Sequence, residues 1–158
     1  MNVLLINGSP HKNGCTNAAL TEMAKVLNEA GIETTIFHIG SAPVGGCVGC
    51  GGCSKAGKCV FGGPVADVTS ARRAGTTTAL EAMEKVPQFF EMPLISSTYW
   101  PMVHGGKAEE VLSDEEGLQI MRNLGRNMAW MLRCIEAGKA AGIAAPVAEN
   151  DKRTNFIR

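Results

Sequence analysis

The stretch Asn2-Val-Leu-Leu-Ile-Asn-Gly-Ser-Pro-His-Lys-Asn-Gly-Cys-Thr-Asn17 decides the fold of this 158-residue chain. Its first six residues, 2–7, form an apolar run without polar alternation, which predicts a strand buried on both faces, as in a parallel sheet. A polar loop containing Gly8 and Gly14 follows directly. The order of strand and glycine-bearing loop is typical of the first turn of an α/β sheet.

A helix and a second strand are predicted after this loop. Leu20, Met23, Ala24 and Leu27 follow the i, i+3, i+4, i+7 spacing of one helix face. Thr16 or Asn17 can cap the start of this helix, and Gly31 stands where a C-terminal cap belongs. The β-branched run 33–39 then reads as a strand, so the first 39 residues predict a βαβ unit.

Further strands and helices alternate along the rest of the chain. The expected elements are a strand over Pro64–Ala71, a helix over Thr76–Val86 stopped by Pro87, a strand over Pro93–Thr98, and a helix from Ser113 or Asp114 to about Ala137 capped by Gly138. This alternation predicts a doubly wound α/β domain over 1–138, with helices on both faces of a parallel sheet. Residues 139–158 are expected to be a loosely held tail or a subunit-contact arm.

Composition excludes several classes of protein. Fifteen Lys and Arg balance fifteen Asp and Glu, a net charge of 15 − 15 = 0, which argues against a nucleic-acid surface. With eight aromatic residues, five Phe, two Trp and one Tyr, a stacking platform for bases is not expected. No apolar run approaches the ~18 residues of a membrane helix, and residues 1–10 lack a secretory signal pattern, so we expect a cytoplasmic protein without membrane association.

The loop Gly8–Asn17 is the first candidate site. Ligands of doubly wound sheets lie outside the carboxyl ends of strands, and free N–H groups at a helix N-terminus favour a phosphate. The loop matches neither the Walker pattern nor Gly-x-Gly-x-x-Gly, which disfavours an ordinary dinucleotide site. It predicts a phosphate-binding turn; the alternative is an ordinary βα turn rich in capping residues.

The cysteine-rich loop 46–60 is the second candidate site. It carries four thiols in the spacing Cys47-x2-Cys50-x2-Cys53-x5-Cys59. Disulfides are rare in the cytosol, so a tight cluster there indicates a metal or redox site. Four thiolates suit a [4Fe–4S] cluster, zinc also accepts four cysteines, and free or redox-paired thiols are the third alternative.

The loop Asn7–Leu20, the cysteine cluster, the turn Ser70–Thr78 and the closing Thr-Asn-Phe-Ile-Arg resemble the flavodoxin-like NADPH-dependent FMN reductases, in the branch that includes the iron–sulfur flavoproteins. The resemblance implies a three-layer flavodoxin-like fold and electron transfer through bound FMN. It places the FMN phosphate among Ser9, His11, Asn13, Cys15, Thr16 and Asn17. It places the isoalloxazine against Ala71, Arg72, Arg73, Ala74, Gly75 and Thr76.

The positive charges of the turn 71–76 are consistent with a bound flavin. A reduced flavin carries negative charge near N1 and O2, which the cationic Arg72 or Arg73 would stabilise; the alternative is that both arginines are surface charges. The resemblance implies an FMN-dependent oxidoreductase that takes electrons from NAD(P)H or a reduced carrier, and a homodimer or homotetramer. Two alternatives are a non-enzymatic flavin or iron–sulfur electron carrier, and a zinc or thiol regulatory module on the same fold.

The sequence departs from this family between the second and third expected strands. A flavodoxin sheet has five parallel strands and the patterns predict four. In the family, the stretch after the last cysteine runs into a helix, a strand, a flavin-contacting loop and a second helix, whereas here Val60-Phe61 meets Gly62-Gly63-Pro64 directly. One strand and its flanking helices are therefore expected to be missing, either by a genuine deletion or because the numbering joins two separated segments.

Remaining polar and sulfur-containing residues give weaker predictions. Cys15 lies near a helix N-terminus, which could lower its thiol pKa, with packing as the alternative. Cys134 and the methionines of the long helix are expected in the core. His104 could edge a substrate pocket or contact a second subunit; the alternative is a loop histidine.

Overall fold

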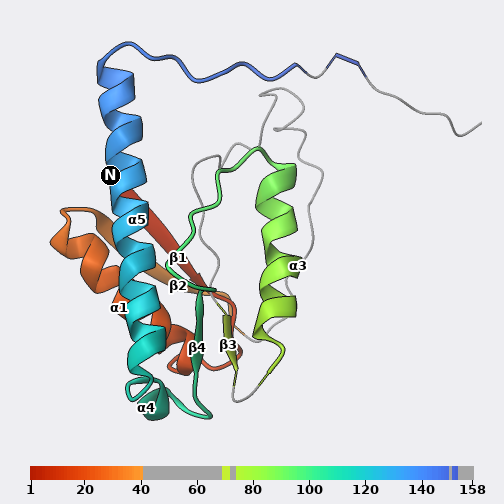
Figure 1. Ribbon diagram of the computed structural model, residues 1–158, viewed down its shortest axis with the longest axis vertical. Coiled ribbons are helices and arrows are strands. Elements are labelled where there is room, and N and C mark those ends of the chain that lie inside the picture. The colour runs from red at the N-terminus through yellow and green to blue at the C-terminus, as the bar shows by residue number, and fades with distance from the viewer. Residues whose placement is uncertain (41–68, 72–73, 150, 153–158) are drawn as a thin grey trace, which may run out of the picture.

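The computed structural model describes residues 1–40, 69–71, 74–149 and 151–152, and Figure 1 shows their arrangement. The elements, in chain order, are β1 (Asn2–Asn7), α1 (Cys15–Glu29), β2 (Glu33–His38), β3 (Thr69–Ala71), α3 (Thr76–Phe89), β4 (Met102–His104), α4 (Ala108–Val111) and α5 (Glu115–Ala140). The predicted βαβ unit at the start of the chain is confirmed. Its helix ends as expected, with Gly31 at a φ of 75° just beyond the last turn.

The described strands form two parallel ladders. β1 pairs with β2 from Asn2–Glu33 to Asn7–His38, and β3 pairs with β4 from Thr69–Met102 to Ala71–His104. Helices α1 and α5 pack together on one side of the strands, and α3 lies on the other side (Figure 1). The α/β class and the parallel pairing are confirmed.

The core lies where α1 crosses α5 over the strands. Its main cluster joins Leu5 of β1 to Met23 and Leu27 of α1 and to Leu124 and Met128 of α5. A second cluster brings Ala19, Val103, Val111, Ile120 and Met121 together at the other end of α1. Met121 and Met128 are therefore packing residues, as expected. The opposite face of the β1–β2 ladder carries Leu4, Ile6 and Phe37, each more than half exposed.

Gly125 sets how closely α1 and α5 approach. A Cβ at this position would lie 3.2 Å from the Met23 carbonyl oxygen and 3.3 Å from the Val26 Cβ. Because the nearest neighbour is backbone, it cannot move aside as a flexible side chain would. A side chain at position 125 would push the two helices apart at the centre of the core.

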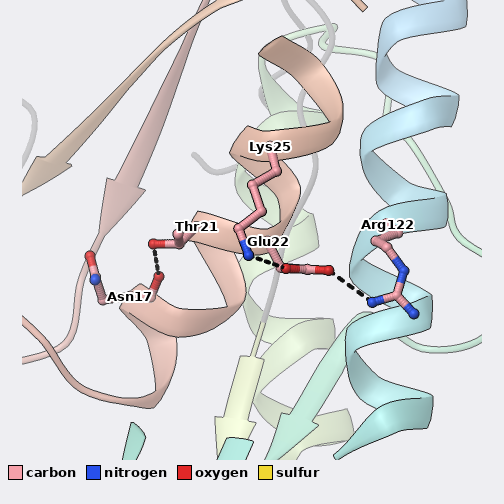
Figure 2. A network of polar contacts seen from close by, with 5 residues as sticks. All are labelled: Asn17, Thr21, Glu22, Lys25 and Arg122. Carbon is pink, nitrogen blue, oxygen red and sulfur yellow. Dashed lines mark hydrogen bonds and ion pairs between the residues drawn. The ribbon is translucent and has the colours of Figure 1, made fainter. Parts of the chain in front are cut away.

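An ion-pair network ties α1 to α5 beside this crossing (Figure 2). The Glu22 carboxylate accepts from Arg122 Nη1 at 2.8 Å and from Lys25 Nζ at 3.0 Å. The hydrogen bond from Arg122 is the largest cause that holds the pKa of Glu22 below its ordinary value; burial opposes it and Lys25 adds to it. Only 14% of the Glu22 side chain is exposed, so the pair is sheltered on the carboxylate side.

Replacing Glu22 with glutamine is expected to lower the free energy of unfolding by about 1 kcal/mol at pH 7, since the charge attraction is lost while the shape is kept. A depressed folded-state pKa stabilises the protein above the unfolded pKa of the carboxyl, and that contribution disappears as the pH falls through the folded value. Urea unfolding of both proteins from pH 7 downward measures this. The difference should shrink below about pH 4.5; a pH-independent difference would contradict the assignment.

The predicted strand over Pro93–Thr98 is wrong, because the described residues there contain only a single bridge, at Leu94, and the strand is β4 at 102–104. Segment 96–98 is instead bonded to α5. Ser97 Oγ donates to the Ile120 carbonyl at 2.8 Å, and Asn127 Nδ2 donates to the Ser96 carbonyl at 2.8 Å. The Ser97 hydroxyl and the Ser96 carbonyl of this run thus bond to groups of α5.

Several predicted helix ends also require correction. Helix α3 continues past Val86 to Phe89, because Pro87 falls in the last turn, where its carbonyl accepts from the amides of Phe90 and Met92. Asp114 is confirmed as the N-cap of α5, accepting from the Gly117 amide at 3.0 Å. Gly138 lies inside α5, which ends at Ala140 before Gly142 at a φ of 81°.

Cys134 was expected in the core and is exposed. The last turns of α5 extend beyond α1 (Figure 1), so they have little to pack against among the residues that the structure describes. Beyond the helix, Ile143 and Val147 are 69% and 93% exposed. The strand residues 64–68 and the Thr-Asn-Phe-Ile-Arg motif lie outside the described residues.

Candidate site at the carboxyl ends of the strands

Asn7, the last residue of β1, organises the loop that follows it. It is fully buried. Its Oδ1 accepts from the Ser9 amide at 3.1 Å, and its Nδ2 donates to the Lys12 carbonyl at 3.0 Å. One side chain therefore satisfies two main-chain groups on opposite limbs of the loop, which fixes the loop as a compact turn.

The rest of the loop closes tightly on itself. Ser9 Oγ accepts from the His11 amide at 3.1 Å, and the Gly14 amide donates to the His11 carbonyl at 3.1 Å. A Cβ on Gly14 would lie 3.1 Å from the His11 Cβ and 3.3 Å from the His11 carbonyl oxygen. A side chain at position 14 would therefore require His11 to shift by a few tenths of an ångström.

Helix α1 begins without a side-chain cap. Its N-cap is Gly14, which corrects the expectation that Thr16 or Asn17 would cap the helix. Within the described residues, no hydrogen bond engages the amides of Cys15 and Asn17. These amides and the positive end of the helix dipole favour an anion at this position.

The predicted phosphate-loop residues lie around this helix end in different ways. Ser9, Cys15, Thr16 and Asn17 are half-buried, whereas His11 and Asn13 are exposed. The Asn17 side chain lies on the other side of α1 from Glu22 (Figure 2). Cys15 points inward, and its Sγ donates to the Gly105 carbonyl at 3.3 Å.

The turn after β4 lies against the phosphate loop through this Cys15–Gly105 contact. Two carboxylates shape the turn: Asp114 Oδ2 accepts from the His104 amide at 2.7 Å, and Glu110 Oε2 accepts from the Gly106 amide at 2.8 Å. His104 is also the residue paired with Ala71 at the end of β3. The carboxyl ends of β1, β3 and β4 therefore converge near the start of α1.

The turn of residues 71–76, which the sequence predicts to face the isoalloxazine, begins at the end of β3. Gly75 is the N-cap of α3 at a φ of 92°, a conformation that favours glycine. The Thr76 hydroxyl donates to the Met102 sulfur at 3.2 Å in the interior. Ala74 and Gly75 are exposed beside it. Arg72 and Arg73 lie outside the described residues, and so do Cys47, Cys50, Cys53 and Cys59.

A separate hollow of about 370 Å³ lies between α3 and the segment before β4. Its walls are Glu84, Leu94, Ile95, Ser96, Ser97, Tyr99, Trp100 and Pro101. None of these residues belongs to the predicted phosphate loop or to the 71–76 turn. Among the described residues, no group of three or more His, Cys, Asp or Glu side chains is placed to hold a metal ion.

The sequence does not predict the residues that support the loop 8–17 from behind without facing a ligand. The sequence pattern makes Asn7 only the last residue of an apolar strand. A polar residue at the end of a buried strand is the signal that could indicate its role in holding the loop. Gly105 and Asp114 contribute to the same region, but their contacts depend on which strands pair. The sequence pattern around them gives no such information.

Comparison with known proteins finds similarity to one protein family and to two curated flavoproteins. Residues 1–60 match the family described as NADPH-dependent FMN reductase. The chain is 27% identical over 132 residues to the iron–sulfur flavoprotein CD630_04720 of Clostridioides difficile, covering 68% of this chain and 58% of that protein. It is 36% identical over 59 residues to the iron–sulfur flavoprotein MJ1083 of Methanocaldococcus jannaschii, covering 37% and 31%. No solved structure matches the chain significantly.

These matches confirm the family resemblance and, with the parallel strands, the flavodoxin-like fold. The chain spans less than two thirds of the length of either curated relative. The loop of residues 8–17 fits the phosphate of FMN: the helix start has no side-chain cap, and the Cys15 and Asn17 amides have no partner among the described residues. No described helix is long and apolar enough to cross a membrane.

Proposed function

We propose that the loop of residues 8–17 binds the phosphate of FMN and that the protein is an FMN-dependent oxidoreductase. The observation that carries this proposal is the start of α1, where Gly14 leaves the helix uncapped and Asn7 holds the preceding turn. Ser9, His11, Asn13, Cys15, Thr16 and Asn17 surround the phosphate. The family match over residues 1–60 supports the choice of FMN over other phosphates.

The second turn, Ala71–Thr76, lies against the isoalloxazine in this proposal. Its support is the rung that pairs Ala71 with His104 and the Cys15–Gly105 contact, which bring that turn and the phosphate loop to one end of the molecule. When bound, FMN supplies the redox chemistry, accepting electrons from NAD(P)H or a reduced carrier. Arg72 or Arg73 stabilises the negative charge of the reduced ring.

Reduction of the FMN-loaded protein by NADH or NADPH under anaerobic conditions tests the activity. Loss of the flavin absorbance with either nicotinamide, followed by its return when a quinone is added, is expected of the oxidoreductase. A protein that binds FMN and is reduced by dithionite but by neither nicotinamide would be an electron carrier instead. That result would contradict the enzymatic part of the proposal and leave the cofactor part standing.

The cysteines Cys47, Cys50, Cys53 and Cys59 form a second proposed cofactor site, for a [4Fe–4S] cluster that passes single electrons between FMN and a partner. Their spacing supports it, and both curated relatives carry the name iron–sulfur flavoprotein. Anaerobically purified protein is expected to hold about four irons per chain, and Cys50→Ser to lose most of them. Zinc in place of iron, or equal iron in Cys50→Ser and Cys134→Ser, would contradict the cluster.

Assembly and location complete the proposal, and the expected assembly follows from the resemblance. We expect a homodimer or homotetramer in the cytoplasm, because a flavin with an exposed ring edge commonly needs a second subunit to complete its pocket. Nucleic acid is not among the expected partners, given the balanced charge of the chain.

A further inference from the structure

His38, the last residue of β2, contacts the phosphate loop from the neighbouring strand. Its Nε2 lies 2.8 Å from the Ser9 carbonyl oxygen. A carbonyl oxygen only accepts, so Nε2 must carry the hydrogen and donate it. In this contact the ring therefore acts as a donor through Nε2.

The parallel register explains how His38 reaches the loop. His38 and Asn7 are paired at the last rung of the β1–β2 ladder, so their side chains point to the same face of the sheet. Both then meet Ser9: Asn7 Oδ1 accepts from its amide at 3.1 Å and His38 Nε2 donates to its carbonyl at 2.8 Å. The main chain of Ser9 is held at both of its polar groups by two adjacent strands.

We infer that His38 is a positioning residue of the phosphate loop and sets the selectivity of the protein for FMN over riboflavin. The inference rests on the proposed function, since it assumes that the loop receives the phosphate. With its carbonyl held by His38, Ser9 cannot turn that oxygen toward the site, where it would repel an anion. Its hydroxyl meanwhile stays bonded to the His11 amide and keeps the turn closed.

Three variants separate positioning from general stability. His38→Phe keeps a flat ring but removes the donor, and His38→Gln offers an amide N–H at about the same reach. Thr34→Val is the matched control: it is also half-buried on β2, and it loses one hydrogen bond, from Thr34 Oγ1 to Asn28 Oδ1 at 3.1 Å, far from the loop.

Flavin-fluorescence titrations with FMN and with riboflavin measure the selectivity of each protein. We expect His38→Phe to bind FMN about tenfold more weakly, the loss of one hydrogen bond, with riboflavin binding unchanged. His38→Gln should recover most of the loss, and Thr34→Val should bind both ligands as the wild type does. Equal FMN affinity for His38→Phe and the wild type, or equal losses for both flavins, would overturn the inference.

Nitrogen NMR of the ligand-free protein gives a readout that needs no flavin. The His38 ring should carry a hydrogen at Nε2, and a ring whose Nε2 carries no hydrogen would overturn the inference. Failure of the wild type to bind FMN would contradict the proposed function and this selectivity role together. FMN binding by the wild type with an unaffected His38→Phe variant would contradict the role of His38 alone.

Discussion

Asn7→Leu is expected to destabilise the protein by about 2–4 kcal/mol, because it leaves two main-chain groups, the Ser9 amide and the Lys12 carbonyl, without their buried partner. Leucine has nearly the same shape, so the loss comes from polar groups and not from a cavity. The loop would also reopen, and FMN affinity should fall at least about tenfold. Chemical denaturation and an FMN titration under native conditions measure the two effects.

A matched control for this variant is Asn123→Leu. Asn123 also bonds across elements, donating from Nδ2 to Thr98 Oγ1 at 3.1 Å, but that bond is exposed to solvent. Water can replace the lost partner there, so we expect a change below about 1 kcal/mol and no effect on FMN. Equal destabilisation by the two variants would show that Asn7 does not hold the loop as described.

Leu27→Ala is expected to have the largest effect on stability, about 2–5 kcal/mol. Leu27 is fully buried in the main core cluster, against residues of both α5 and the strands. Truncation removes apolar contacts and leaves a cavity that helices packed as closely as α1 and α5 cannot collapse to fill. Urea unfolding at pH 7 measures the change in the free energy of unfolding.

Leu112→Ala is the control for this core variant. Leu112 follows α4 directly and is 63% exposed, so its truncation should change stability by less than about 0.5 kcal/mol. If Leu27→Ala were as mild as Leu112→Ala, the α1–α5 interface would not be the core of the molecule.

The first third of the fold could be predicted from the sequence because its signals are local. The run Val3–Ile6 and the helical spacing of Leu20 to Leu27 each specify an element without reference to the rest of the chain. Strand β4 could not be found in this way, since three residues give no periodicity. The stronger β pattern at 93–98 is bonded to α5, a contact between segments more than twenty residues apart.

In the candidate site, too, the local features were predictable from the sequence and the long-range contacts were not. The loop of residues 8–17 was predictable from its glycines, its polar residues and its place between a strand and a helix. The contacts that hold it were not, because they depend on the strand register that pairs Asn7 with His38 and on the long-range approach of Gly105 to Cys15. The sequence predicts a side-chain cap at Thr16 or Asn17, whereas the structure has Gly14 as the N-cap with no side-chain hydrogen bond.

Parallel titrations of the protein with FMN and riboflavin test the central claim most directly, since the two ligands differ only by the phosphate. If the open end of α1 receives that phosphate, FMN should bind at least about a hundredfold more tightly than riboflavin, the value of roughly two charge-assisted hydrogen bonds. Inorganic phosphate should compete with FMN. Equal affinities for the two flavins, or no FMN binding at all, would contradict the claim.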